Sequence, residues 1–442
     1  MRKNDVSGSD DWLAHAGMPL RGRVRVPGDK SISHRAMMLG ALADGACRVT
    51  GFLEGEDTLA TAAAFRAMGV KIEVDGPGVR IVHGVGIDGL KPPAGPIDCG
   101  NAGTGMRLLA GLLAGQAFDA VLIGDASLSR RPMRRVTDPL AGMGAVIETA
   151  DDGCPPLQVR GGQALVGTDY ALPVASAQVK SALLLAGLYA KGTTRVREPH
   201  PTRDYTERML AALGWPVEFS PGYVSLPGGH RVRACDIAVP SDFSSAAFFM
   251  AAACIVPGSD LVLEAVGMNP RRTGLLHVLR LMGANIEAHN RREDGGEPVA
   301  DLHVRYAPLR GIEVPTRLVP DMIDEFPVLF VTAAAADGAT VVRGAAELRV
   351  KESDRIATMA DGLRTLGIRV DEAADGATIH GGHFGGGAVS AHHDHRIAMS
   401  FVVAGQLACA PVHIRGCRTV ATSFPGFLHT ATGCGMGLEA VS

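Results

Sequence analysis

The densest group of reactive side chains lies in residues 27–35, which read Pro-Gly-Asp-Lys-Ser-Ile-Ser-His-Arg. A strand-like stretch precedes this segment and a helix-like stretch follows it. A turn that leads into a helix N-terminus presents free backbone N–H groups, and this one also carries a lysine, two serines and an arginine. Such groups suit the binding of phosphate or carboxylate, although a solvated helix start has the same composition. The segment is not a Walker A loop, because Asp29 separates Gly28 from Lys30.

The first half of the chain repeats this arrangement. Residues 100–107 (Gly-Asn-Ala-Gly-Thr-Gly-Met-Arg) lead into an apolar helix, and residues 129–135 hold four arginines. Residues 174–181 and 201–206 place further polar side chains before apolar helices. Polar residues at several helix starts favour multidentate anion binding. A tight turn would also explain the glycines, and a solvated surface would also explain the arginines.

The second half supplies carboxylates beside cations. Asp324 and Glu325 precede an apolar helix, and residues 348–355 combine three cations with two acids. Carboxylates near cations are suited to general acid–base catalysis, although they could also be helix caps only. Residues 392–396 (His-His-Asp-His-Arg) could suggest a metal site. We expect no metal there, because the cluster is contiguous and no companion ligand motif occurs elsewhere.

Composition excludes several classes of protein. The chain has 442 residues, a formal net charge of −3 and 5% aromatic residues, which disfavours binding to nucleic acid or to an anionic membrane. The eight cysteines form no CxxC pair, so we expect a cytoplasmic protein without structural zinc. Only seven of the 43 basic residues are lysines, so a lysine within a dense polar motif suggests a need for a compact ammonium group. We expect residues 1 to about 18 to form a loosely ordered tail.

The elements that position these motifs follow an internal repeat. An apolar stretch, a glycine, two further residues, an aliphatic residue and an acid recur six times, with the glycines at positions 69, 144, 214, 283, 367 and 435. The pattern predicts a helix that ends at a left-handed glycine and is followed by a short strand. Six such units predict an α/β protein with two domains of three units each. We place the crossing between the domains near residues 235–242.

These motifs together resemble the 5-enolpyruvylshikimate-3-phosphate synthase family, in the bacterial branch often called class II. The resemblance is carried by residues 27–35, 100–107, 322–327, 349–355 and 394–396, and runs from about Leu20 to Glu439. It implies a two-domain inside-out α/β barrel of six βαβαββ-type repeats. The implied divisions are residues 1–22 (a tail and a strand that joins the second domain), 23–238 (the first domain) and 239–442 (the second domain).

The resemblance also implies a reaction. Phosphoenolpyruvate and shikimate 3-phosphate would give an enolpyruvyl ether and phosphate, without a cofactor or metal, as a step of aromatic amino-acid biosynthesis. Both partners are small anionic molecules, which matches the many cations of the motifs. We expect positive side chains from both halves of the chain to share a pocket with Asp324 and Glu352. The chain is expected to act as a monomer, without nucleic acid or membrane partners.

Roles carried over by matching position cover three groups of residues. The implied catalytic residues are Asp324, as the base for the attacking hydroxyl, with Glu352 and Lys30 as candidates for the other proton transfers. The implied phosphoenolpyruvate ligands are Lys30, Asn101, Gly103, Arg131, Gln178, Arg355 and Arg396. The implied shikimate 3-phosphate ligands are Lys30, Ser31, Arg35, Ser176, Ala177, Gln178, Arg203, Asp324 and Lys351.

Two positions bear on the phosphoenolpyruvate site in particular. Many relatives carry a lysine where this chain has Thr422, so Lys351 or a water would have to replace that contact. Gly103 has no side chain, so the family's inhibitor glyphosate would have room to bind. We therefore expect a glyphosate-sensitive enzyme.

Three other functions compete with this one. UDP-N-acetylglucosamine enolpyruvyl transferase shares the fold, but its reactive loop carries a cysteine, which the arginine-rich loop after Asp125 lacks. RNA 3′-terminal phosphate cyclases contain related repeats, but the net charge and few aromatic residues disfavour them. A non-catalytic anion-binding protein would explain the cations and leave Asp324 and Glu352 without a purpose.

Overall fold

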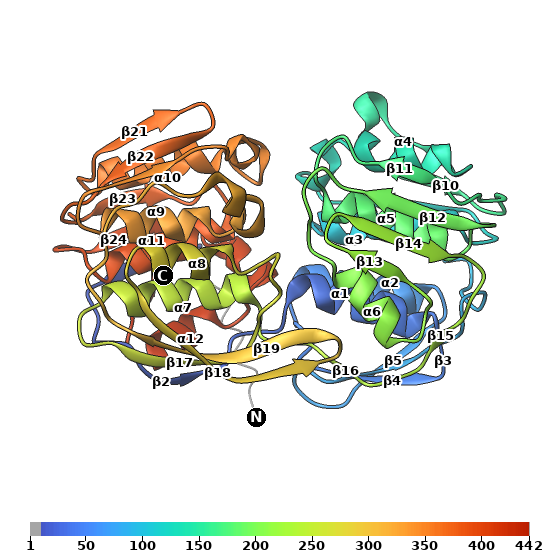
Figure 1. Cartoon of the computed structure of the whole chain (residues 1–442), viewed down its shortest axis with the longest axis horizontal. Coiled ribbons are helices and arrows are strands. Elements are labelled where there is room, and N and C mark those ends of the chain that lie inside the picture. Colours follow the sequence, from blue (N-terminus) through green and yellow to red (C-terminus); the bar gives the residue numbers. More distant parts are fainter. Residues whose placement is uncertain (1–9, 442) are drawn as a thin grey trace. The chain divides into compact units, whose positions relative to one another are not determined.

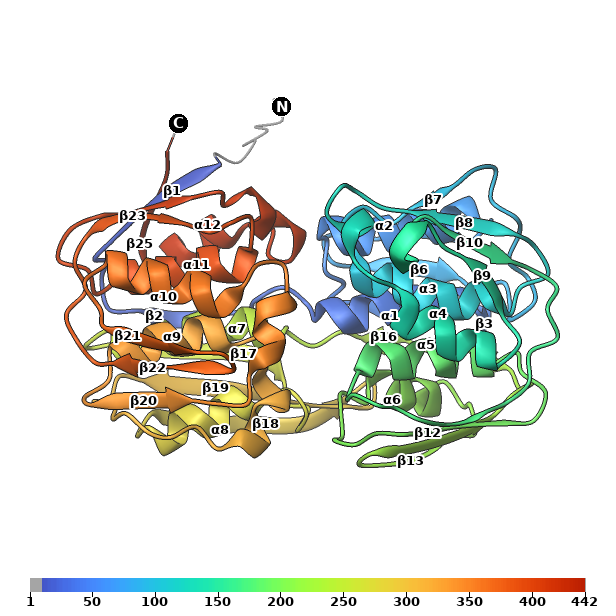
Figure 2. The same cartoon turned by 90° about the horizontal axis from the view of Figure 1, so that it is seen from above.

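The computed structural model describes residues 10–441. The chain divides into two compact units (Figures 1 and 2). Unit 1 consists of Met1–Pro27, Ser241–Arg292 and Pro298–Ser442, and unit 2 consists of Gly28–Pro240 and Glu293–Glu297. The domain limits at residues 22 and 238 stay a prediction. Within residues 10–441, no helix has both the length and the apolar character needed to cross a membrane.

The repeat predicted from the six glycines is confirmed. Each glycine has a left-handed backbone, with φ between +78° and +114°, and each follows the end of a helix by two residues. A glycine tolerates this conformation because it has no Cβ atom, and it therefore ends the helix cleanly. The six helices are α2 (Glu56–Ala67), α4 (Arg134–Gly142), α6 (Tyr205–Ala212), α8 (Gly274–Leu281), α10 (Arg355–Thr365) and α12 (Phe427–Gly433).

A second helix in each repeat is almost fully buried. These inner helices are α1 (Lys30–Ala41), α3 (Gly103–Ala114), α5 (Ala177–Gly187), α7 (Phe243–Ile255), α9 (Phe326–Ala334) and α11 (His395–Gly405). A helix that is apolar on all sides must lie inside the protein. Most of their polar residues lie near the N-terminal ends, and Asp29, Ser176, Asp242 and Asp394 cap four of these helices through side-chain oxygens. Three of the predicted functional motifs, at residues 27–35, 174–181 and 392–396, lie at these capped ends.

Three four-stranded sheets surround the helices of unit 2. In Figure 2, α3, α4 and α5 lie between the sheet that contains β8 and the sheet that contains β12. The strand orders are β16 (Ile237–Ala238), β4 (Ala46–Thr50), β6 (Arg80–His83), β5 (Lys71–Val74); then β7 (Ile97–Asp98), β8 (Ala120–Ile123), β10 (Leu157–Arg160), β9 (Val146–Glu148); and β11 (Asp169–Ala171), β12 (Thr193–Arg197), β14 (Tyr223–Pro227), β13 (Glu218–Ser220). A two-stranded sheet joins β15 (Val232–Arg233) to β3 (Ala43–Asp44).

Unit 1 repeats the plan. Its sheets have the orders β18 (Asn285–Asp294), β19 (Glu297–Arg305), β17 (Asp260–Gly267), β2 (Arg21–Val24); then β20 (Ala339–Val342), β22 (Gly376–His380), β21 (Val370–Ala373); and β23 (Gly387–Ser390), β24 (Val412–Arg415), β1 (Asp11–His15), β25 (Gly437–Val441). Along the chain, β7-α3-β8-α4-β9-β10 and β11-α5-β12-α6-β13-β14 follow the order βαβαββ. The predicted fold class is therefore confirmed.

The N-terminal segment differs from the predicted loose tail. Residues 1–9 lie outside the described residues, but Asp11–His15 form β1, which pairs with both β24 and β25. Burial alternates along this strand: Trp12 and Ala14 are buried, while their neighbours are partly exposed. Such alternation is typical of a strand with one face against the core. The Trp12 ring also stacks on Phe427, with ring centroids 5.6 Å apart. The prediction of a loose tail was wrong for residues 11–15, because the consecutive apolar residues Trp12, Leu13 and Ala14 show no alternation in the sequence.

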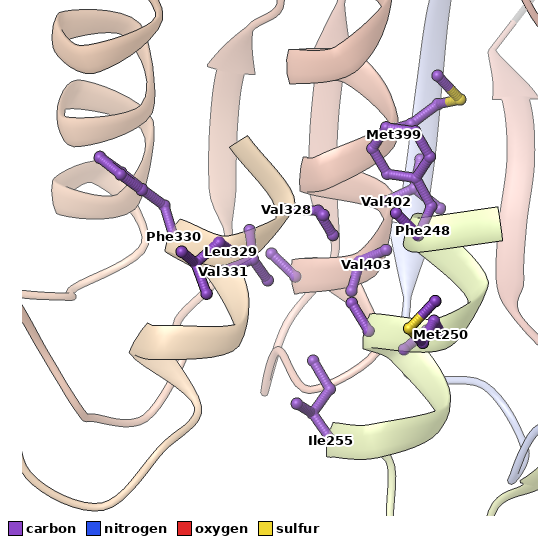
Figure 3. Packing of buried hydrophobic residues seen from close by; sticks show 14 of the residues in the cluster. Phe248, Met250, Ile255, Val328, Leu329, Phe330, Val331, Met399, Val402 and Val403 are labelled. Atoms are coloured by element: carbon purple, nitrogen blue, oxygen red, sulfur yellow. The ribbon is translucent and has the colours of Figure 1, made fainter. Parts of the chain in front are cut away.

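Each unit has its own hydrophobic core. In unit 1 the core forms where α7, α9 and α11 pack together, and Figure 3 shows Met250, Val328 and Val403 from these helices close to one another. A large-to-small substitution in such a core typically costs about 2–5 kcal/mol. The cores therefore fix the inner helices, and with them the polar residues at the start of each helix.

Candidate active site

The α1 start is the first candidate site in unit 2. The Asp29 carboxylate accepts a hydrogen bond from the Ile32 amide at 2.9 Å and so caps the helix. Lys30 Nζ lies 2.8 Å from Asp57 Oδ2, and the Lys30 side chain is one quarter exposed. This contact holds the ammonium group at the N-terminal end of α1, where the helix dipole favours anions.

Arg35 lies one helical turn deeper and is almost fully buried. Its guanidinium donates to Thr206 Oγ1 at 2.7 Å, to the Ser31 carbonyl oxygen at 2.8 Å and to Ser181 Oγ at 2.8 Å. Burial lowers the pKa of Arg35 to about 10, and the group stays protonated at neutral pH. Of the predicted shikimate 3-phosphate ligands, the structure thus brings Ser31 and Arg35 into direct contact.

The α3 start gathers three of the predicted phosphoenolpyruvate ligands. The Arg131 guanidinium donates to Asn101 Oδ1 at 2.8 Å, and Asn101 in turn donates to Asp125 Oδ2 at 2.7 Å. A Cβ atom placed on Gly103 would lie 3.1 Å from an Arg131 nitrogen. Asn101, Gly103 and Arg131 therefore form one group, and Gly103 leaves space beside the guanidinium.

The α5 start lies against the same group. Gln178 accepts a hydrogen bond from Arg107 at 2.8 Å and donates to Thr104 Oγ1 at 2.9 Å. Ser176 caps α5 by accepting from the Val179 amide at 3.4 Å, and Ala177 is the first helical residue. The predicted ligands Ser176, Ala177 and Gln178 are consequently consecutive at a helix start that contacts α3. The predicted ligand Arg203 comes two residues before α6 begins at Tyr205.

In unit 1 the centre of the candidate site is Arg355, whose side chain is only 2% exposed. Its guanidinium donates to Asp394 Oδ2 at 2.8 Å and to Glu352 Oε2 at 2.6 Å, and it lies 3.8 Å from Asp324 Oδ1. Burial alone would lower the pKa of Arg355, but these three carboxylates raise it above its ordinary value. Arg355 also lowers the pKa of Asp394 below its ordinary value, against the opposing effect of burial.

Asp324 lies among three arginines. Its carboxylate is 3.2 Å from Arg272, 3.8 Å from Arg355 and 3.9 Å from Arg396. Arg396 also donates to the Asp324 carbonyl oxygen at 3.1 Å, which ties the α11 start to the α9 start. The structure therefore brings together four predicted residues of the second half, Asp324, Glu352, Arg355 and Arg396.

Lys351 and Thr422 make contacts outside the cluster around Arg355. Lys351 forms an ion pair with Glu347 at 2.6 Å. The next residue, Glu352, forms its ion pair with Arg355. The Thr422 hydroxyl donates to the Thr419 carbonyl oxygen at 2.7 Å. Neither contact joins these residues to the cluster around Arg355.

The histidine cluster at residues 392–395 lies at the turn before α11. His392 and His393 are exposed and have positive φ angles, whereas Asp394 is buried and pairs with Arg355. Within residues 10–441, one group of His, Cys, Asp or Glu side chains has the spacing of metal ligands, and it is not this cluster but Glu287, His289 and His303. Arg305 donates to both Glu287 and His303, so a cation already occupies this surface.

The comparison with protein families identifies the reaction class. The chain matches the family model described as EPSP synthase (3-phosphoshikimate 1-carboxyvinyltransferase) over residues 14–430.

The chain belongs to the EPSP synthase family.

Individual members of the EPSP synthase family are similar over almost their whole length. The 3-phosphoshikimate 1-carboxyvinyltransferase of Xanthomonas axonopodis pv. citri (strain 306) is 68% identical over 433 residues, covering 98% of each chain. The solved EPSP synthase from Acinetobacter baumannii is 52% identical with a TM-score of 0.91, covering 98% of this chain and all of that one. The enolpyruvyl transferase NikO from Streptomyces tendae shares the fold at 20% identity, with a TM-score of 0.79 and coverage of 98% and 99%.

Four residues that contact the predicted ligands were not themselves among the predicted ligands. Asp57 pairs with Lys30, Arg107 with Gln178, Arg272 with Asp324, and Asp394 with Arg355. Arg107 and Asp394 lie inside the motifs that carried the family resemblance, so their sequence signal was present. Asp57 and Arg272 stand outside any motif. The packing of α1 on α2 places Asp57 beside Lys30, and Arg272 precedes α8, which contacts the turn Pro320–Met322 just before Asp324.

Proposed function

We propose that the chain transfers the enolpyruvyl group of phosphoenolpyruvate to the 5-hydroxyl of shikimate 3-phosphate and releases phosphate. The observation that carries the proposal is the match to the EPSP synthase family over residues 14–430, together with 68% identity to a named 3-phosphoshikimate 1-carboxyvinyltransferase. The proposal includes a monomeric enzyme in the cytoplasm that needs no cofactor or metal.

The reaction consists of an addition followed by an elimination. The 5-hydroxyl oxygen bonds to C2 of phosphoenolpyruvate and loses its proton, while C3 gains a proton and becomes a methyl group. The C2–O bond to phosphate then breaks, and one methyl proton leaves to restore the double bond. Protons therefore move at two atoms in each half of the reaction, which requires positioned acids and bases.

We assign phosphate recognition to the helix starts of unit 2. Lys30, Arg131 and Gln178 are the proposed ligands of the phosphoenolpyruvate phosphate, with Asn101 and the Gly103 backbone beside them. Ser31 and Arg35 are assigned to the ring and carboxylate of shikimate 3-phosphate, and Ser176, Ala177 and Arg203 to its phosphate. The contact of Arg131 with Asn101 and of Gln178 with Arg107 supports one shared anion site at the α3 and α5 starts.

We assign proton transfer and carboxylate recognition to unit 1. Arg355 and Arg396 are the proposed ligands of the phosphoenolpyruvate carboxylate, and Asp324 is the proposed base for the 5-hydroxyl. Glu352 is held by Arg355 at 2.6 Å and is one third exposed, so it can exchange a proton with a substrate. Glu352 and Lys30 both remain candidates for protonating C3 and for handling the leaving phosphate.

Release of inorganic phosphate from phosphoenolpyruvate tests the proposal. The purified chain is incubated with phosphoenolpyruvate and a chelator, with or without shikimate 3-phosphate, and UDP-N-acetylglucosamine serves as the competing acceptor. With phosphoenolpyruvate present, we expect phosphate release only when shikimate 3-phosphate is the acceptor, and NMR should show the enolpyruvyl ether product. Release with the nucleotide sugar would instead support the related transferase. The absence of turnover with either acceptor, together with retained binding of both anions, would support a non-catalytic anion-binding protein.

A further inference from the structure

Unit 2 contains a buried charge cluster that none of the proposed steps uses. It consists of Lys180 on α5, Glu198 after β12 and Glu207 on α6, and we call it the Lys180 cluster. Lys180 Nζ lies 2.9 Å from Glu198 Oε2 and 2.8 Å from Glu207 Oε1. The three side chains are at most 3% exposed. Burying three charges costs a large desolvation free energy, so a cluster of this kind calls for an explanation beyond stability.

The charges of the cluster are mutually dependent. Burial raises the pKa of the Glu207 carboxyl, and Lys180 opposes that rise. Burial would lower the pKa of Lys180, but the two carboxylates raise it above its ordinary value. Arg35 is close enough for Glu207 to raise its pKa as well, against the larger effect of burial. Lys180 and Arg35 thus both interact with the Glu207 carboxylate.

The Lys180 cluster joins the segments that carry the proposed phosphate ligands of shikimate 3-phosphate. Lys180 comes one helical turn after Ser176, and its backbone amide donates to the Ser176 carbonyl oxygen at 3.1 Å. Glu198 accepts hydrogen bonds from the Thr202 amide at 3.2 Å and from the Thr202 hydroxyl. Thr202 directly precedes Arg203. The ammonium group therefore ties the α5 start to the backbone next to Arg203.

A second path from the cluster leads to Arg35. Glu207 lies in the first turn of α6, next to Thr206, and Thr206 both accepts from Arg35 at 2.7 Å and donates to Ser181 at 2.8 Å. Ser181 follows Lys180 on α5. Since α1, α5 and α6 meet here through these contacts, a shift of the cluster would displace Arg35 as well as Arg203.

We infer that Lys180, Glu198 and Glu207 are positioning residues for the shikimate 3-phosphate ligands Ser176, Arg203 and Arg35. This inference rests on the proposed function and deepens it. The choice of lysine fits the geometry, because a compact ammonium can sit between two buried carboxylates where the wider guanidinium fork would not. Lysine is also unusual in a chain that has 36 arginines and seven lysines.

The variants Glu198→Gln and Thr202→Val test the inference. Glu198→Gln keeps a hydrogen-bond acceptor but removes one charge, and Thr202→Val removes the hydroxyl while leaving the three charges in place. In either variant we expect KM for shikimate 3-phosphate to rise about tenfold, because a displacement of about 1 Å in positioning groups can cost about 10²-fold. KM for phosphoenolpyruvate should change less than about twofold. Thr202→Val also keeps the test decisive if Glu198→Gln does not fold.

The control is Glu54→Gln, which alters an ion pair of the same unit, with Arg80, outside the proposed site. A structural role alone would lower the melting temperature and the active fraction while leaving both KM values unchanged, and that result would overturn the inference. An equal rise in both KM values would also overturn the inference.

Calorimetric binding of shikimate 3-phosphate distinguishes failure of the inference from failure of the proposed function. If the unaltered enzyme is active and the variants bind shikimate 3-phosphate as tightly as it does, only the inference fails. If the unaltered chain neither binds shikimate 3-phosphate nor catalyses the reaction, the proposed function itself is contradicted.

Discussion

The arginines Arg35 and Arg131 of unit 2 differ from Arg355 of unit 1 in the partners of their hydrogen bonds. In unit 2, Arg35 donates to two hydroxyls and a carbonyl oxygen, and Arg131 donates to an amide oxygen and a hydroxyl. In unit 1, Arg355 pairs with Glu352 and Asp394. Neutral partners orient a guanidinium without cancelling its charge, whereas carboxylate partners neutralise it and are themselves held in place. The surroundings of Arg35 and Arg131 therefore suit anion binding, whereas Arg355 holds acids in place beside a cation.

The largest expected effect comes from removing a carboxylate of unit 1. In Asp324→Asn the proposed base for the 5-hydroxyl is lost, while the size and shape of the side chain are kept. We expect kcat to fall by about 10²–10⁴-fold, the usual contribution of a positioned acid or base. Calorimetric affinity for shikimate 3-phosphate should change far less. Steady-state kinetics and calorimetry together check the split, and a loss of affinity as large as the loss of kcat would break the contrast between the units.

The next largest effect is expected from removing a positively charged side chain of unit 2. Arg131→Met should weaken phosphoenolpyruvate binding by about 10–150-fold, since a hydrogen bond to a charged group contributes about 1.5–3 kcal/mol. Arg135→Met, an exposed arginine of the same segment, is the matched control and should bind as before. Fluorescence or calorimetric titration measures both. Equal weakening in the two variants would mean that general charge, rather than the position of Arg131, attracts the anion.

Acidification should affect the two units in different pH ranges. His34 is fully buried, and burial lowers its pKa to about 3 from an ordinary 6.5. The unfolded chain therefore binds a proton that the folded chain excludes, and stability falls as the pH drops below about 6.5, by about 2 kcal/mol at about pH 5. In unit 1 the pKa of Asp394 is lowered, so its ionised carboxylate stabilises the folded state above pH 3.8, its ordinary pKa, and this stabilisation is lost as the pH falls below that value.

Denaturant unfolding at about pH 7.5 and about pH 5 checks this range. The unaltered chain should lose about 2 kcal/mol more than His34→Asn, because the variant lacks the buried imidazole. A variant that loses as much stability on acidification as the unaltered chain would show that groups other than His34 control this range.

The smallest effect concerns the space beside Arg131. In Gly103→Ala the new Cβ atom would lie 3.1 Å from Arg131 and 3.2 Å from Arg107, so these side chains must shift by a few tenths of an ångström. Overpacking of this kind costs about 1–3 kcal/mol, and we expect glyphosate inhibition to weaken by about tenfold or more. KM for phosphoenolpyruvate should rise less. Unchanged inhibition would contradict the placement of the inhibitor beside Gly103.

Local signals in the sequence predicted much of this molecule. The six glycines predicted six helix ends because a left-handed residue is a local requirement that only glycine meets at low cost. The order of the motifs predicted the family, which the comparisons confirm, and the site residues, which stay a prediction. The strand at Asp11–His15 and the partners Asp57 and Arg272 were missed, because each depends on a contact between segments that are distant in the sequence.

Strand β1 has a consequence for how the chain is assembled during synthesis. Its residue Asp11 accepts a hydrogen bond from the Gly416 amide, 405 positions further along the chain. The sheet of β23, β24, β1 and β25 can close only when nearly the whole polypeptide has left the ribosome, whereas all of unit 2 except residues 293–297 is available by residue 240. Until then, Trp12 and the other apolar residues of the early segment have no partner, and they are candidates for chaperone binding.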